Sequence, residues 1–143
     1  MTKKSDVAVV VLVLVIYLAI LTGLVNPATV DGVSMYPIFQ NGSLVFYDPG
    51  HSNIQLYSVI IYRSLQNTPI IHRVIGIRRV DSIPYYITQG IDKITNPLPD
   101  NVVGFESREG APANTVIGVV ISVGGIQISI PYLGYISMLF YGI

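Results

Sequence analysis

The sequence contains no cysteine and only two histidines among its 143 residues. The missing cysteines exclude disulfide bonds, thiolate metal sites and a cysteine nucleophile. Zinc sites draw mainly on cysteine and histidine, so the two histidines leave almost no ligands for one. We therefore expect no metal site.

Charged residues are also scarce, since Asp, Glu, Lys and Arg make up 11% of the chain and the formal net charge is +0. A protein that binds a phosphate backbone needs a basic face or stripe. The composition supplies no such surface, so nucleic acid is not an expected partner.

Hydrophobic residues, by contrast, make up 51% of the sequence, and the mean hydropathy is +0.60. A single domain is expected at this length, and the composition is too apolar for a wholly soluble chain of this size. Part of the chain should therefore contact lipid.

The longest apolar run covers nineteen uncharged residues from Val7 to Val25. As a helix it would be roughly 28 Å long, close to the thickness of the hydrocarbon core of a bilayer. A cleaved signal peptide and a buried core helix are the alternatives. Apolar regions of signal peptides are usually about 7 to 15 residues long, and no small-residue cleavage site follows this run. We therefore predict an uncleaved membrane anchor, ended by Pro27 and the Gly32 region.

Lys3 and Lys4 precede the run, and no Lys or Arg follows it until Arg63. The positive-inside rule then keeps the amino terminus in the cytoplasm. The predicted localisation is the cell membrane, crossed once, with the rest of the chain outside the cytoplasm.

After the anchor, short runs rich in Val, Ile and Tyr alternate with Gly, Pro, Asn and Asp, a pattern typical of strands and turns. The predicted strands are Leu44–Tyr47, Val59–Arg63, Ile70–Arg79, Tyr85–Thr88, Thr115–Val123 and Ile126–Ile130, with Gly124–Gly125 as a hairpin turn. The fold class is therefore mainly β, a compact and mostly antiparallel barrel or sandwich behind one N-terminal transmembrane helix. Turn-forming residues dominate between Gly90 and Pro112, which predicts long loops there.

Three parts are expected along the chain. Residues 1–26 form the cytoplasmic amino terminus and the anchor, residues 27–130 an extracytoplasmic β domain, and residues 131–143 an apolar, membrane-proximal tail. The tail is too short to span a bilayer, but it has no charge and several tyrosines, which favour membrane interfaces. It either dips into the outer leaflet or covers the core as a terminal strand or helix.

Ser34 and His72 are the residues of the β domain that suggest chemistry. A hydroxyl becomes a good nucleophile when a positioned base takes its proton. Pro37 and Gly32 constrain the backbone on either side of Ser34, and His72 lies in a strongly apolar, strand-like run. Lone serines in loops and lone histidines on strands are more often structural. His51 lies among loop-forming residues and is the weaker candidate for a base.

Four short blocks follow the anchor in a fixed order. They are Ser34-Met35-Tyr36-Pro37, then Ile71-His72-Arg73-Val74-Ile75, then Thr88-Gln89-Gly90 leading to Asn96-Pro97-Leu98-Pro99-Asp100, and finally Ile130-Pro131-Tyr132-Leu133-Gly134-Tyr135-Ile136. In this order the chain resembles the type I signal peptidases, and specifically their archaeal and endoplasmic-reticulum branch, which uses Ser, His and Asp. Each block is unspecific alone, but together they cover nearly the whole chain.

The resemblance implies that Ser34 is the nucleophile, that His72 is the general base and later protonates the leaving amine, and that Asp100 orients the imidazole. Asp92 is the alternative to Asp100, because residues 91–95 interrupt the family's compact Gly-Asp-Asn-Asn motif. Either aspartate could instead be only a turn former.

The resemblance also implies shallow apolar pockets for small substrate side chains near the scissile bond. The candidate substrate-binding residues are Met35, Pro37, Ile71 and Val74. An extended substrate could add to the β domain as a further strand.

Two features bear on the mechanism. A lysine base is disfavoured, because Lys3 and Lys4 lie across the membrane from the β domain and only Lys93 remains. Gly32 stands where relatives often carry a serine that completes the oxyanion hole. The backbone N–H of Ser34 could still donate to the oxyanion.

The resulting hypothesis is a membrane-bound serine endopeptidase that removes N-terminal signal peptides from secreted preproteins at the outer membrane surface, without a cofactor. Its expected partners are preproteins, the lipid bilayer and, as a further candidate, the protein translocation channel. Two alternatives are a pilin-like filament subunit, whose apolar helix would pack against other helices, and a catalytically silent relative that binds preproteins.

Overall fold

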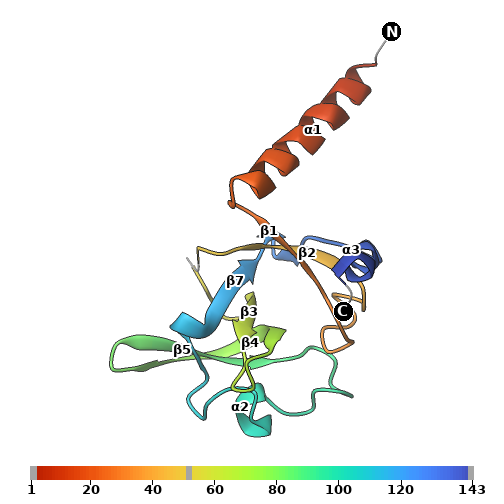
Figure 1. Ribbon diagram of the computed structural model, residues 1–143. Helices are drawn as coiled ribbons and strands as arrows, with labels where there is room; N and C mark the ends of the chain where they lie inside the picture. Colours follow the sequence, from red (N-terminus) through yellow and green to blue (C-terminus); the bar gives the residue numbers. More distant parts are fainter. Residues whose placement is uncertain (1–2, 51–52, 142–143) are drawn as a thin grey trace.

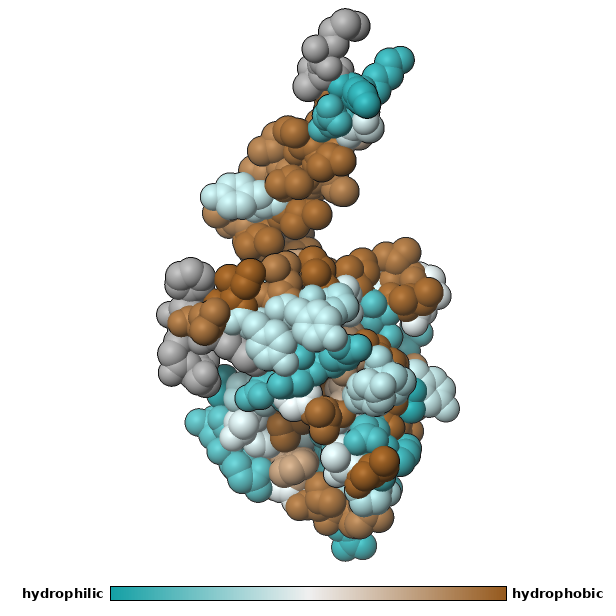
Figure 2. Space-filling view, turned by 90° about the vertical axis from the view of Figure 1, so that its right-hand side faces the viewer, coloured by the Kyte–Doolittle hydropathy of each residue, from teal (hydrophilic) through white to brown (hydrophobic). Residues whose placement is uncertain are grey.

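The computed structural model describes residues 3–50 and 53–141. One long helix, α1 (Lys4–Leu21), extends away from a β-rich body (Figure 1). Its 18 residues have a mean hydropathy of 2.4 and none is buried, so the helix is long and apolar enough to cross a membrane. A signal sequence near the amino terminus would meet the same criterion. Figure 2 shows the hydrophobic surface of the helix continuing onto the adjoining end of the body.

The helix ends earlier than predicted, at Leu21 instead of Val25. The hydroxyl of Thr22 donates to a carbonyl of the preceding turn at 2.8 Å, and Gly23 adopts a φ of 73°. A left-handed glycine just after the last turn is a common helix stop. The chain then enters strand β1 (Asn26–Thr29), which the sequence pattern did not predict.

The body is built on one antiparallel sheet with the strand order β1-β2-β7-β3-β4-β5-β6, and β10 pairs with β2. Its further strands are β2 (Leu44–Asp48), β3 (Val59–Arg63), β4 (Pro69–Val80), β5 (Ile83–Gln89), β6 (Ala111–Pro112), β7 (Val116–Val120) and β10 (Ser129–Ile130). A small separate hairpin contains β8 (Ser122–Val123) and β9 (Ile126–Gln127). The prediction of a mainly antiparallel β body behind one apolar helix is confirmed.

The predicted strand over Thr115–Val123 is divided in the structure into β7 and β8. Ile121 lies between them, and its N–H donates to the carbonyl of Phe46 at 2.8 Å. Gly124 and Gly125 connect β8 to β9 with φ values of 60° and 81°. Positive φ at both central residues is what the favoured two-residue hairpin turn requires, so the predicted turn is confirmed.

Strand β3 is buried on both faces and divides the core into two clusters. Successive side chains of a strand point to opposite faces, and its branched and aromatic residues suit a position covered on both sides. The first cluster consists of Val30, Met35, Phe39, Val45, Val59, Ile61 and Val120. The second consists of Ile60, Tyr62, Val74, Tyr86, Ala111 and Val116.

Three short helical elements lie outside the sheet. They are α2 (Asp100–Val103), η1 (Ala113–Thr115) and α3 (Gly134–Tyr141). The described part of the carboxy-terminal tail thus includes a helix, which lies beside β1 (Figure 1). Ile136 and Leu139 of this helix are 52% and 83% exposed. Insertion of the tail into a bilayer stays a prediction.

Candidate active site

Ser34 lies on a loop whose two ends are joined by a backbone hydrogen bond. The N–H of Val30 donates to the carbonyl of Ser43 at 2.9 Å. Within the loop, Met35 and Phe39 are fully buried in the first core cluster. Because the residue that follows it is fixed in the core, the backbone of Ser34 is held in place while the residue itself stays partly exposed.

A second segment, residues 90–96, holds the same serine from the other side. The carbonyl of Ser34 accepts hydrogen bonds from the N–H of Asp92 at 3.0 Å and from Nδ2 of Asn96 at 3.5 Å. Gly90 permits this close approach, since a Cβ at this position would lie 2.7 Å from the Ser34 carbonyl oxygen and 2.5 Å from Cγ of Asn96. This segment, which contains residues 91–95, therefore forms a support for the serine loop.

The pairing of three neighbouring strands places Tyr62, His72 and Thr88 on one face of the sheet. His72 of β4 is opposite Ile60 of β3, and Thr88 of β5 is opposite Val74 of β4. Residues that are paired, or two apart on one strand, share a face. The register therefore brings a phenol, an imidazole and a hydroxyl together beside the second core cluster.

These three side chains converge on Asp100, the first residue of α2. Its Oδ2 accepts hydrogen bonds from the Tyr62 hydroxyl at 2.8 Å and from the Thr88 hydroxyl at 2.6 Å, and it lies 2.5 Å from Nδ1 of His72. His72 and Asp100 are 3% and 1% exposed. A buried carboxylate is costly unless it is hydrogen-bonded, and here three donors can serve one oxygen. Oδ1 of Asp100 is buried and has no hydrogen-bond partner within the described part of the chain.

The contact of His72 with Asp100 defines which ring nitrogen can act as a base. An ionised carboxylate only accepts hydrogen bonds, so Nδ1 of His72 carries the proton that lies toward Asp100. In the neutral ring, Nε2 then has a free lone pair. Burial, together with the charge of Asp100, raises the pKa of Tyr62, so this phenol remains a donor at any physiological pH.

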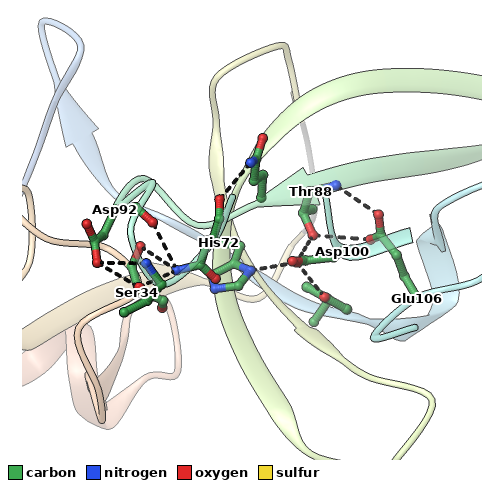
Figure 3. A network of polar contacts seen from close by, with 10 residues as sticks. Ser34, His72, Thr88, Asp92, Asp100 and Glu106 are labelled. Carbon is green, nitrogen blue, oxygen red and sulfur yellow. Dashed lines mark hydrogen bonds and ion pairs between the residues drawn. The ribbon is translucent and has the colours of Figure 1, made fainter. Parts of the chain in front are cut away.

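His72 and Ser34 line the same cleft, which has a volume of about 720 Å³. In Figure 3 the imidazole lies between Ser34 on one side and Asp100 on the other. Among the described residues, no hydrogen bond joins the Ser34 hydroxyl to the ring. The cleft wall is mostly apolar and includes Ala28, Val33, Ile61, Ile70, Ile71 and Phe105. The arrangement can support proton transfer between a serine and a histidine in a partly enclosed space.

Asp92, the alternative to Asp100, contacts its own loop. Its carboxylate accepts hydrogen bonds from the Thr95 hydroxyl at 2.7 Å and from the backbone N–H groups of Ile94 and Thr95 at 3.3 Å. The hydrogen bond from the Thr95 hydroxyl lowers the pKa of Asp92. No hydrogen bond or ion pair connects Asp92 to His72 in the part of the chain that the structure describes.

The four candidate substrate-binding residues lie in different places. Met35 and Val74 are fully buried, one in each core cluster, and neither belongs to the described lining of the cleft. Pro37 is exposed on the serine loop and is also outside that lining. Ile71 lines the cleft next to His72. Apolar residue type alone does not distinguish a pocket wall from a core position.

The remaining sequence candidates have simpler positions. Gly32 has a φ of 105°, its N–H donates to Oδ1 of Asn41 at 2.8 Å, and a Cβ at this position would meet open space. Lys93 is exposed and does not belong to the described lining of the cleft. His51 lies outside the described residues.

Tyr62, Thr88 and Glu106 are constituents of the site that sequence reasoning did not select. Glu106 is only 3% exposed and contacts Thr88 through both carboxyl oxygens. The one available signal was the alternation of side chains along strands, which places Tyr62 and Thr88 on the face of His72 only once the register is known. The sequence around Glu106 has no pattern that predicts the burial of this residue.

Comparison with protein-family models places the chain beside known proteins. The family model described as signal peptidase, peptidase S26, matches residues 4–81, more than half of the chain. The match includes Ser34 and His72 and ends before Thr88 and Asp100. No curated protein matches the chain. On the strength of the family match, the chain belongs to the S26 family of signal peptidases.

Proposed function

We propose that this chain is a membrane-anchored signal peptidase that uses Ser34 as nucleophile, His72 as general base and Asp100 as the residue that orients the base. The observation that carries the proposal is the buried pair of His72 and Asp100 beside a cleft that Ser34 also lines. The family match supports peptide-bond cleavage as the activity and preproteins as the substrates. Use of Ser, His and Asp would assign the chain to the archaeal and endoplasmic-reticulum branch.

The proposed reaction is acyl transfer in two steps. Nε2 of His72 takes the proton of the Ser34 hydroxyl as Oγ attacks the scissile carbonyl, and the imidazolium then gives that proton to the leaving amine. Water, deprotonated by the same nitrogen, releases the new carboxyl end and restores the serine. Asp100 stabilises the imidazolium and holds its tautomer.

The negatively charged oxygen that forms when Ser34 attacks needs hydrogen-bond donors, and few candidates can be named. Gly32 supplies no hydroxyl, and its own N–H already donates to Asn41. The backbone N–H of Ser34 is the donor we assign, because the nucleophile's own amide lies next to the carbon under attack. The contacts that hold the serine loop therefore position two groups, the attacking hydroxyl oxygen and this amide.

Lysine is a poorer candidate for the base than His72. Lys93 is exposed and lies outside the described cleft lining, so nothing desolvates its ammonium group. His72 is buried and has a carboxylate partner. A buried, paired imidazole is the arrangement that serine hydrolases with a histidine base require.

Substrate binding is assigned to the cleft wall instead of the core. Ala28 of β1 and Ile71 of β4 both line the cleft, and β1 is the first strand in the order of the sheet. An extended peptide could run between them with small side chains against the apolar wall. With α1 in the bilayer and the body outside, residues 27–130 would meet a preprotein at the membrane surface, and residues 131–143 would contribute a membrane-proximal helix.

The direct test is cleavage of a preprotein by the full-length chain in detergent. Ser34→Ala and His72→Ala should each abolish detectable turnover, because removal of a triad residue costs about 10⁴- to 10⁶-fold. Equal cleavage by wild type and both variants would refute the assignment. Binding of a preprotein without cleavage by the wild type would favour the silent relative, and secreted filaments would favour a pilin.

A further inference from the structure

Glu106 is a buried acid that the proposed mechanism does not use. It lies behind Asp100 and reaches it through one residue, Thr88 (Figure 3). Oε1 of Glu106 accepts a hydrogen bond from the backbone N–H of Thr88 at 3.0 Å, and Oε2 lies 3.1 Å from the Thr88 hydroxyl oxygen. The same hydroxyl is 2.6 Å from Oδ2 of Asp100. Two carboxyl groups therefore meet at one hydroxyl.

The number of hydrogens at this hydroxyl determines what state Glu106 must have. Thr88 has a single hydroxyl hydrogen, and its shorter contact is to Asp100. If Glu106 were ionised as well, its Oε2 would face the lone pairs of the Thr88 oxygen with no hydrogen between them. A proton on Oε2 of Glu106 removes this conflict, because Glu106 then donates to Thr88 and Thr88 donates to Asp100.

The surroundings of Glu106 favour the protonated form. Burial is the largest cause and raises the pKa of Glu106 to about 7. The charge of Asp100 also raises this pKa, whereas the hydrogen bonds from Thr88 and from the backbone of Ala111 lower it. Within the described residues no salt bridge reaches Glu106. The group therefore sits near the point at which a change of pH within the physiological range alters its charge.

Other titratable groups face the same region from several elements. Tyr62 and His72 contact Asp100 from β3 and β4. On its other side Glu106 lines a hollow of about 300 Å³, together with Arg63, Tyr85 and Glu109. Arg63 and Glu109 are exposed, so water screens their charges, whereas Asp100 is buried with Glu106. The hollow also gives protons from solvent a route to Glu106.

We propose that Glu106 is a positioning residue of the active site, which in its protonated form donates to Thr88 and so commits the Thr88 hydroxyl to Asp100. The proposal rests on the proposed function, since it takes Asp100 as the partner of the base. Loss of the Glu106 proton to solvent puts a second negative charge behind Asp100. The Thr88 hydroxyl is then shared between two carboxylates, and Asp100 is held less firmly against His72. Catalysis therefore declines as Glu106 ionises.

The test is the pH profile of kcat/KM for a preprotein, measured on the full chain from about pH 5.5 to about pH 9. Glu106→Gln is the informative variant, because its amide nitrogen donates to Thr88 at every pH and its amide oxygen still accepts from the Thr88 N–H. The wild type should lose activity on the alkaline side, and Glu106→Gln should retain it there. Glu109→Gln replaces an exposed carboxyl group of the same hollow in the same way and should keep the wild-type profile.

Two further variants test whether the hydrogen bonds of Glu106, and not only the volume of its side chain, are needed. Glu106→Leu and Thr88→Val should each lower kcat by about 10- to 100-fold, the value of a hydrogen bond to a charged group. Glu106→Gln should rescue the loss seen with leucine. In the Thr88→Val background, Glu106→Gln should no longer change the profile, because the connecting hydroxyl is gone.

The outcomes are separable from those of the proposed function. If Ser34→Ala cleaves like the wild type, the proposed function fails. If Ser34→Ala is inactive while Glu106→Gln and the wild type have superimposable profiles, only the role of Glu106 is refuted. Thermal unfolding of each variant identifies any that fail to fold. If Glu106→Leu does not fold, the pH profile of Glu106→Gln alone decides whether the proposed role of Glu106 is correct.

Discussion

The backbone N–H of Asp92 donates a hydrogen bond of 3.0 Å to the carbonyl oxygen of Ser34. The side chain of Asp92 accepts a hydrogen bond from Thr95 instead. Asp100, in contrast, meets His72 through its side chain. The two aspartates that the sequence left as alternatives thus contact different halves of the site, one the main chain of the serine and the other the ring of the histidine.

Replacing each aspartate by asparagine should separate these contacts. Asp100→Asn should lower kcat by about 10⁴-fold, because the asparagine amide can donate to Nδ1 and favours the wrong tautomer of His72. Asp92→Asn keeps an oxygen for the bonds from Thr95 and should change kcat by less than about threefold. Single-turnover cleavage of a preprotein gives both values. Comparable losses in the two variants would contradict the division of roles.

Gly90→Ala tests whether the segment over residues 90–96 positions Ser34. The added Cβ would lie 2.7 Å from the Ser34 carbonyl oxygen, so either the serine or the segment must move. A displacement of about 1 Å at a nucleophile can cost about 10²-fold in rate. Gly76→Ala is the matched control, since its Cβ would have a nearest neighbour at 3.4 Å, in ordinary contact. A Gly90→Ala variant with wild-type kcat would show that this support is dispensable.

Tyr62→Phe removes one of the donors to Asp100 while keeping the buried ring. The lost hydrogen bond has a length of 2.8 Å and ends on a buried carboxylate. The free energy of unfolding should fall by about 1 to 3 kcal/mol, and kcat should fall with it. Denaturant unfolding in detergent measures the first and preprotein cleavage the second. Tyr85→Phe is the control, because among the described hydrogen bonds of Asp100 none involves Tyr85.

Local sequence pattern predicted the elements of this fold better than their ends and contacts. Strand β3 begins and ends where expected, at Val59 and Arg63, because four consecutive residues of high β propensity precede Arg63 and serines flank the run on both sides. Strand β1 was not expected, since Asn26 and Pro27 are poor strand formers and are held there by pairing with β2. Tertiary pairing overrides propensity at such positions.

The same holds for the site: residues recognisable from their sequence neighbours were predicted, and those that depend on long-range strand pairing were not. Ser34 and His72 were selected from their immediate neighbours and line one cleft. Tyr62 and Thr88 reach Asp100 across separations of 38 and 12 residues, which only the strand register brings together. Met35 was assigned to substrate and lies in the core, since apolar character is the same in both settings.

The stability of the protein should depend on pH through Glu106. Its pKa is raised from 4.5 to about 7 in the folded state, chiefly by burial. Below the unfolded value both states hold the proton, and the contribution of the group to stability is fully present. As the pH rises through this window the unfolded state loses its proton first, so the free energy of unfolding falls by up to about 1.4 kcal/mol per pH unit and levels off above the folded value.

Glu106→Gln isolates this contribution from that of other acids, such as Asp92, whose lowered pKa acts in the opposite direction. Glutamine does not titrate, so the stability of the variant relative to the wild type should increase between about pH 4.5 and about pH 7 and then stay constant. Denaturant unfolding of the full chain in detergent at several pH values measures the difference, and exposed Glu109→Gln serves as the control. Parallel curves for Glu106→Gln and the wild type would mean that Glu106 is ionised to the same extent in both states. In that case Glu106 would have no proton with which to donate a hydrogen bond to Thr88. The direction of the Thr88 hydroxyl toward Asp100 would then have to be fixed by the Thr88 backbone alone.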